Sequence, residues 1–291
     1  MFRGLSIRDL ENLSGVKAHT IRIWEKRYSI FNPERTATNI RTYSSSDLKK
    51  LLNISSVLKH GMKISKACSL SYPELINEIE RIESTVIDSA TEVYVNQLIV
   101  ATVNCNNQEF NYHYAKAVNQ FGLEHTIEKV AYPMFMRIGL MWSVDRLSPA
   151  QEHFATQLIR QKLFTAIDAL EADYSKEAYL LFLPEGENHE VGLLYANYLI
   201  KKAGHNCIYL GADVPIDGVK ECLENAHVKR ALTHFTVIRK PEVLSKYLQL
   251  LNEELNSTKV YISGVALNPI SVENQQNLVV LEKIDELRKL L

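Results

Sequence analysis

The chain has 291 residues, of which 46 % are apolar and 23 % charged, and its formal net charge at pH 7 is −1. This composition is typical of soluble globular proteins, and the length allows two or three domains with their own cores. No apolar run is long enough to span a bilayer, and the first residues lack the apolar stretch of a signal peptide, so we expect a cytoplasmic protein. The four cysteines are scattered without a CxxC pair, which predicts reduced, mostly buried thiols.

The charge is unevenly distributed along the chain. Residues 1–66 carry 13 Lys and Arg against 5 Asp and Glu, whereas the remainder carries 20 against 29. A basic segment ahead of an acidic body indicates that only the N-terminal part meets a polyanion such as DNA.

The basic segment has the pattern of a helix, a tight turn and a second helix. Apolar residues from Leu5 to Leu13 recur at helical spacing, and Ser14-Gly15 predicts the turn. The second helix, which reaches Tyr28, would present its basic and polar first turns to the major groove of DNA, as a helix-turn-helix does. The turn-rich residues 29–48 predict a wing, a small β-ribbon that grips phosphates. A generic basic helical domain is the alternative.

The acidic body has two parts with different periodicity. Residues 75–175 carry helical apolar spacing almost throughout and predict a four-helix bundle, in which Ser148 and Pro149 mark a helix start. From residue 177 onward, short apolar runs alternate with amphipathic stretches, which predicts a doubly wound parallel sheet. The expected fold is α/β and multidomain: a winged helix-turn-helix (1–74), a helical bundle (75–175) and a flavodoxin-like or Rossmann-like domain (176–291).

A histidine flanked by acids follows the first predicted strand of the sheet, in the stretch Glu-Asn-His-Glu-Val-Gly at 187–192. Doubly wound sheets bind ligands past the carboxyl ends of their strands, where His189 is expected. An exposed histidine in a polar turn is the simplest interpretation, and a zinc site would need more ligands than Glu187 and His189. The chain lacks GxSxG, HExxH and P-loop motifs, so we predict that it is not an enzyme.

Three motifs carry a resemblance to known families. The stretches "IRIWEKRY" and "IRTYSSSDLKKL" resemble the winged DNA-binding domain of the MerR family of transcription regulators, over roughly residues 4–70. Residues 187–192 fit the [D/E]xHxxG signature of cobalamin-binding domains. Trp142 and Glu152-His153 match the W-x9-EH motif of the helical cap in CarH- and LitR-type photoreceptor regulators. The resemblance to these regulators covers nearly the full chain.

The resemblance implies that the first domain binds promoter DNA and that the protein acts as a homo-oligomer, a dimer or a tetramer. The long coiled-coil helix of MerR dimers is not evident, because residues 71–90 contain Pro73 and keep no heptads, so the contacts between protomers are expected elsewhere. Trp24 would belong to the core. The implied DNA contacts come from the second helix and the wing: Lys17, His19, Thr20, Arg22, Arg27, Arg35, Arg41 and Tyr43.

For the body, the resemblance implies adenosylcobalamin held between the helical cap and the sheet. His189 would bind the cobalt through one imidazole nitrogen, and Glu187 would accept a hydrogen bond from the other. Gly192 would let the backbone approach the tail of the corrin. Light would cleave the cobalt–carbon bond, change the assembly and release DNA. The implied cofactor-binding residues are Trp142, Glu152, His153, Glu187, His189, Gly192, Thr233, Ser263 and Gly264.

The sequence departs from the family pattern at three positions. Ser143 stands where light-sensing members have a histidine, Phe235 is bulkier than the leucine of the Ser-x-Leu strand, and Ser263 replaces the first glycine of a Gly-Gly pair. Two alternatives therefore stay open. One is a cobalamin-independent regulator with a degenerate pocket. The other is a corrinoid carrier of a methyltransferase, which would have no use for a basic DNA-binding domain.

Overall fold

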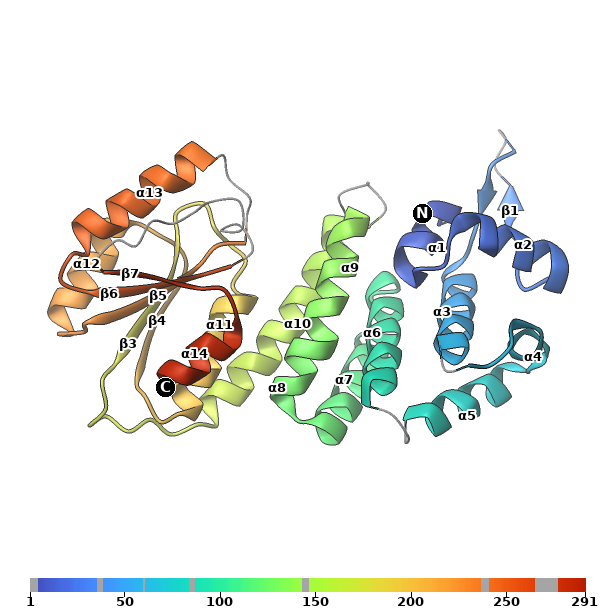
Figure 1. The fold of residues 1–291 in the computed structure, drawn as a ribbon, viewed down its shortest axis with the longest axis horizontal. Helices are drawn as coiled ribbons and strands as arrows, with labels where there is room; N and C mark the ends of the chain where they lie inside the picture. Colours follow the sequence, from blue (N-terminus) through green and yellow to red (C-terminus); the bar gives the residue numbers. More distant parts are fainter. Residues whose placement is uncertain are drawn as a thin grey trace. The chain divides into compact units, whose positions relative to one another are not determined.

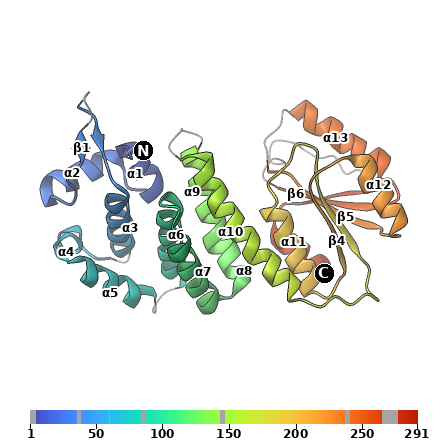
Figure 2. The same ribbon diagram turned by 180° about the vertical axis from the view of Figure 1, so that it is seen from behind.

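The computed structural model describes residues 5–35, 39–59, 61–83, 87–142, 147–236, 241–264 and 277–291. The chain forms two compact units, residues 1–155 and residues 156–291, and each is described by itself (Figures 1 and 2). Among the described helices, none is both long enough and apolar enough to cross a membrane. The four cysteines are free, but Cys105 is exposed and the other three are only partly buried, so the expectation of mostly buried thiols is wrong.

The first unit begins with the helix-turn-helix that the sequence predicts. A capping box starts the first helix, because the side chains of Ser6 and Asp9 each accept a hydrogen bond from the other residue's backbone N–H. Gly15 ends this helix in the left-handed conformation, with φ at 70°. The carboxylate of Glu11 accepts a hydrogen bond from the N–H of Ala18 at 3.2 Å and so fixes the turn. The elements of this domain are α1 (Ile7–Ser14), α2 (Ala18–Tyr28), β1 (Glu34–Arg35), β2 (Arg41–Thr42), α3 (Ser45–Lys59), α4 (Ile64–Ser69) and α5 (Tyr72–Glu83).

The wing is a two-stranded antiparallel ribbon, as predicted. Glu34 of β1 lies opposite Thr42 of β2. Directly after β2, Tyr43 exchanges two backbone hydrogen bonds of 2.8 Å with Leu5. The wing is therefore anchored to the start of the domain, and Figure 1 shows it beside α2.

A helical bundle built around α6 completes the first unit. All residues of α6 from Val93 to Val103 are buried, so this helix must be covered on every side. The winged domain contributes α3 and α5 to this cover, and the bundle contributes α7, η1 and α9. The elements of the bundle are α6 (Ile87–Val103), α7 (Asn107–Phe121), α8 (Leu123–Thr126), the π-helical turn η1 (Ile127–Ala131), α9 (Tyr132–Trp142) and α10 (Pro149–Asp168), and α10 runs past the boundary between the units.

The winged domain and the bundle pack directly on each other. Besides the contact between α3 and α6, α1 packs against α9. The amide of Gln97 donates a hydrogen bond to Asn53 at 3.5 Å, and Lys49 forms an ion pair with Glu109 at 3.8 Å. The winged domain and the part of the predicted bundle up to residue 155 thus lie in one compact unit of the structure.

The second unit is a five-stranded parallel sheet with the order β4-β3-β5-β6-β7. After β3 the chain adds β4 on one side of it, and then returns to add β5 on the other side, followed by β6 and β7. The direction of strand addition reverses here, so β3 and β5 flank the topological switch point. The apolar runs of the sequence predicted these strands. The last 15 residues, 277–291, contain both a strand and a helix. The elements are β3 (Tyr179–Pro184), α11 (Val191–Lys202), β4 (Cys207–Val214), α12 (Ile216–Asn225), β5 (Arg230–His234), α13 (Pro241–Glu254), β6 (Lys259–Ser263), β7 (Leu278–Leu281) and α14 (Ile284–Leu290).

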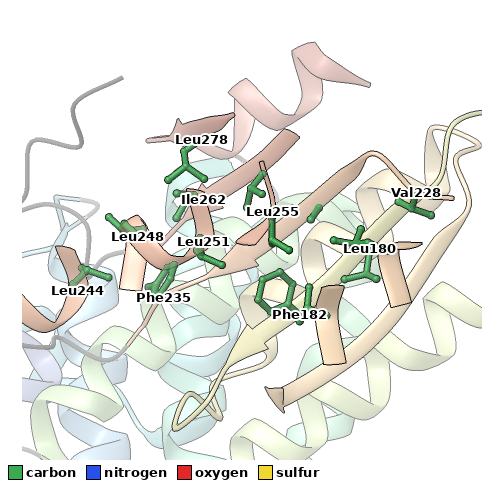
Figure 3. Close-up of a cluster of buried hydrophobic side chains, with 14 residues drawn as sticks. Leu180, Phe182, Val228, Phe235, Leu244, Leu248, Leu251, Leu255, Ile262 and Leu278 are labelled. Carbon is green, nitrogen blue, oxygen red and sulfur yellow. The ribbon is translucent and has the colours of Figure 1, made fainter. Parts of the chain in front are cut away.

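The two faces of the sheet carry different helices. The crossover from β3 to β4 runs in the opposite direction to those from β4 to β5 and from β5 to β6, so right-handed connections put α11 on one face and α12 and α13 on the other. Figure 3 shows the apolar core on the second face, where Phe182 and Ile262 of the sheet meet Leu248 and Leu251 of α13. Phe235, which directly follows β5, belongs to the same core.

We expect Gly264→Ala to lower the free energy of unfolding by about 3 kcal/mol or more. The φ of Gly264 is +120°, and a Cβ atom there would lie 2.1 Å from the carbonyl oxygen of Phe235. Gly218→Ala is the matched control, because nothing lies within 4 Å of its would-be Cβ and it sits in α12. That change should alter stability by about 1 kcal/mol or less. Urea unfolding followed by circular dichroism measures both, and equal stabilities of the two variants would contradict the strain at Gly264.

Candidate ligand site and nucleic-acid interface

A buried carboxylate organises the loop that follows β3. Glu187 is fully buried, and its Oε1 accepts hydrogen bonds from the backbone N–H of His189 at 3.1 Å and from Nδ1 of His189 at 2.6 Å. Its Oε2 accepts a hydrogen bond from the N–H of Thr236 at 3.0 Å. Thr236 lies just past β5, so this one side chain joins the carboxyl ends of the two strands that flank the switch point.

The same contact orients the imidazole of His189. Because Nδ1–H donates to the carboxylate, the neutral ring carries its lone pair on Nε2. The side chain of His189 is 55 % exposed whereas that of Glu187 is 0 % exposed. An exposed imidazole held by a buried carboxylate is the arrangement in which a histidine binds a metal through Nε2. In the described part of the chain, no group of three or more His, Cys, Asp or Glu residues could hold a metal ion.

A second carboxylate, which the sequence analysis did not single out, fixes the start of α11. Glu190 accepts hydrogen bonds from Arg160 of α10 and from the hydroxyl of Tyr209 of β4, the latter at 3.1 Å. Burial and the adjacent carboxylate raise the pKa of Tyr209, so its hydroxyl stays protonated and donates. Asp213, at the end of β4, accepts a hydrogen bond from the N–H of Gly186 at 2.7 Å. The loop from 185 to 190 is thus held from three sides.

The glycine of the motif faces a side chain of β5. A Cβ atom on Gly192 would lie 2.5 Å from Nε2 of His234, so the imidazole packs on the bare backbone of α11. Nδ1 of His234 shares a hydrogen bond of 2.9 Å with the hydroxyl of Ser263. Burial lowers the pKa of His234 to about 4 even though the Glu187 carboxylate favours the protonated form, so the ring is neutral at pH 7.

Two predictions for β5 need correction. Successive side chains of a strand point to opposite faces, and the register pairs Thr233 with Phe182 and Ile262, which belong to the core under α12 and α13. Thr233 therefore lies on the face opposite Gly192, although we predicted that both contact the cofactor. Phe235 fills the same core and does not narrow the space beside Gly192. The residue that narrows this space is His234. Given the register of β5, the alternation of side chains along the strand would have placed His234 on the face of Gly192.

The remaining predicted glycine has a structural reason. The N–H of Phe235 donates to the carbonyl of Ser263 at 2.8 Å, which draws the ends of β5 and β6 together at Gly264. There is no room for a side chain at this position.

The predicted cap residues lie in the first unit. Trp142 is the last residue of α9, and Ser143 lies outside the described residues. Ser148 caps α10 as predicted, and the Gln151 amide donates to the carbonyl of Val103 at 2.6 Å. In the next turn Nδ1 of His153, a side chain that is 70 % exposed, lies 2.7 Å from the carboxylate of Glu152.

The helix-turn-helix presents a basic surface. The predicted DNA contacts Lys17, His19, Arg22, Arg27 and Arg35 are exposed, and Thr20 is partly exposed, so each is accessible to a ligand. Ile23, on the same helix α2, is 54 % exposed.

Two residues predicted to contact DNA from the wing region form hydrogen bonds within the domain, and for Arg41, whose side chain is 38 % exposed, the DNA contact stays a prediction. The carboxylate of Glu25 on α2 accepts hydrogen bonds of 2.8 Å from both Arg41 and the hydroxyl of Tyr43. Tyr43 is 1 % exposed and packs edge-on against Phe31. Tyr43 is therefore a core residue, and the prediction that it contacts DNA is corrected; Glu25, which we did not single out, joins the wing to α2.

Comparisons with known proteins match two regions of the chain to family models. Residues 5–69 match the family model of the MerR HTH family regulatory protein, and residues 94–166 match that of the B12 binding domain. The HTH-type transcriptional repressor CarH of Myxococcus xanthus is 27 % identical over 210 residues, which cover 70 % of this chain and 70 % of the repressor. The HTH-type transcriptional repressor CarA of the same organism is 26 % identical over 250 residues, 84 % of this chain and 81 % of that repressor.

A solved structure shares the fold. The monomethylamine corrinoid protein of Methanosarcina barkeri superposes with a TM-score of 0.54 at 18 % identity, over 69 % of this chain and 97 % of that chain. With the two family models, these findings confirm the expected α/β fold class with a helical N-terminal part. The chain thus joins a MerR-type helix-turn-helix to a B12 binding domain, and over most of its length it is similar to two transcriptional repressors.

Proposed function

We propose that the protein binds promoter DNA under the control of adenosylcobalamin, with Nε2 of His189 as the axial protein ligand of the cobalt. The observation that carries this proposal is the buried Glu187 carboxylate, which fixes the tautomer and direction of an exposed imidazole at the switch point of the sheet. When bound, adenosylcobalamin would supply a cobalt–carbon bond that light can cleave.

The donor set fits this cofactor at the axial position, because a single protein nitrogen suffices for a cobalt already held by a macrocycle. The space beside Gly192 fits less well, because the imidazole of His234 occupies it. A regulator that retains the fold but takes up no complete cobalamin is therefore the second candidate. A corrinoid carrier of a methyltransferase is a weaker one, since the basic surface of α2 would serve no purpose there.

Three further residues are proposed to contact the cofactor. We propose this role for Trp142, Glu152 and His153, and the support from geometry is the contact of 2.7 Å between the last two. Cofactor binding would then favour one assembly of protomers, a dimer or tetramer, because a ligand that binds a single assembly state shifts the equilibrium toward it. Light-driven loss of the upper ligand would reverse the shift and release DNA in the cytoplasm.

His189→Ala should remove most of the affinity for adenosylcobalamin. Glu187→Gln, which keeps the size of the side chain but not its charge, should lower affinity about 10- to 100-fold because the imidazole loses its acceptor. Visible spectra recorded during titration in the dark measure both effects. His227→Ala, an exposed histidine in the turn before β5, is the control and should bind as the wild type does. Unaltered binding and spectrum in His189→Ala would exclude this residue as the ligand.

The cofactor should change the size of the assembly. Size-exclusion chromatography of the protein with adenosylcobalamin in the dark should give a larger mass than the protein alone, and green light should reverse the change. A mass that responds to the cofactor but not to light would leave a cobalamin sensor and remove the photoreceptor function. A mass that never responds would contradict control through assembly.

Arg22→Ala should weaken DNA binding and reduce the slope of log affinity against log salt by about 1, as expected for one lost phosphate contact. Arg8→Ala, an exposed arginine on α1, removes the same charge away from the second helix and is the matched control. Fluorescence anisotropy with operator DNA at several salt concentrations measures both. Cofactor uptake should be the same in the two variants, and an equal loss of DNA affinity in Arg8→Ala would argue against α2 as the DNA-reading helix.

A further inference from the structure

We call the space between the first turn of α11 and the end of β5 the groove, and a side chain of the protein itself fills it. Gly192 lies three residues after His189 in the first turn of α11, and its missing side chain leaves room between the helix and β5. The imidazole of His234 takes that room, close enough that a Cβ atom on Gly192 would overlap its Nε2. The close packing of His234 therefore explains why this position carries a glycine.

The imidazole is held in place. Its Nδ1 shares a hydrogen bond of 2.9 Å with the hydroxyl of Ser263. That hydroxyl also donates a longer hydrogen bond, of 3.4 Å, to the carbonyl oxygen of Thr233. Burial keeps the ring neutral. If His234 moves out of the groove, its imidazole loses the hydrogen bond to Ser263 and must be hydrated or packed elsewhere. This free-energy cost weakens the binding of any ligand that needs the same space.

A cobalamin that is held through His189 needs such a space. The nucleotide base of cobalamin is tethered to the corrin ring and otherwise occupies the same axial position of the cobalt. If Nε2 of His189 takes this position, the base is displaced on the side of the corrin that faces His189. An aromatic base of this kind needs space beside that imidazole. His234 fills the space between Gly192, three residues after His189, and the end of β5.

We propose that His234 is a plug that makes the site discriminate between corrinoids, favouring one without the nucleotide base, such as cobinamide, over complete cobalamin. This inference rests on the proposed binding through His189. In this proposal His234 determines which corrinoid binds, because it fills the groove and does not take part in the bond between His189 and the cobalt. The adenosyl forms of cobinamide and cobalamin are suitable probes, because they share the corrin and the upper ligand and differ in the nucleotide loop.

The test compares the affinities of the full chain for these two probes in the dark. His234→Ser opens the groove, and His234→Asn is a smaller side chain that can keep a hydrogen bond to Ser263, so one variant remains if the other fails to fold. His227→Ser is the matched control on an exposed histidine. The quantity of interest is the ratio of the two affinities, because the general difficulty of displacing the base from cobalt is the same in every variant.

Opening the groove should raise the affinity for adenosylcobalamin by about tenfold or more, the equivalent of one lost hydrogen bond and its desolvation, and leave that for adenosylcobinamide nearly unchanged. The control should keep the wild-type ratio. An unchanged ratio in folded His234→Ser and His234→Asn would overturn the plug while the proposed function stands. Failure of the wild type and all variants to bind either probe would overturn the proposed function, and the plug with it.

Discussion

The buried carboxylate of Glu187 is the interaction on which the ligand side of the molecule depends. A carboxylate without solvent contact is costly unless it is surrounded by donors, and the N–H groups of His189 and Thr236 together with Nδ1 of His189 meet that need. Two of these donors are backbone groups from loops after different strands. The loops can therefore shift only by leaving the charge uncompensated, and this rigidity gives the imidazole a defined direction at the edge of the sheet.

The sequence was informative wherever the determining contacts are local. Glu187 and His189 are two residues apart, and the apolar run of β3 and the glycine after α1 determine their own elements, so the pair, the strand and the turn could all be predicted. The residues that bond this loop from other strands could not be predicted. Thr236, Tyr209 and Asp213 reach the loop from other strands, and their positions follow from the strand order and register of the sheet.

The errors in the site have the same origin. A motif aligned by residue type placed Thr233 in the groove, but the two-residue alternation of a strand assigns neighbours to opposite faces, and the register decides which face is which. His234 could be recognised as the groove residue only after β5 had been paired with β3 and β6. Tyr43 was misplaced for a similar reason, since its backbone pairing with Leu5 draws the ring into the core.

The environment of α3 has a consequence for how this regulator can be recombined with others. Five consecutive residues of the helix, from Leu51 to Ser55, are buried, so this stretch is covered on every side. Its neighbours come both from the winged domain, α1, α4 and α5, and from the bundle, α6. A chimaera that exchanged only the DNA-binding segment would place a foreign helix in the middle of a shared core. Domain shuffling in this lineage would thus carry α3 and α6 together, and a new operator specificity would arise more readily by point changes on the exposed side of α2.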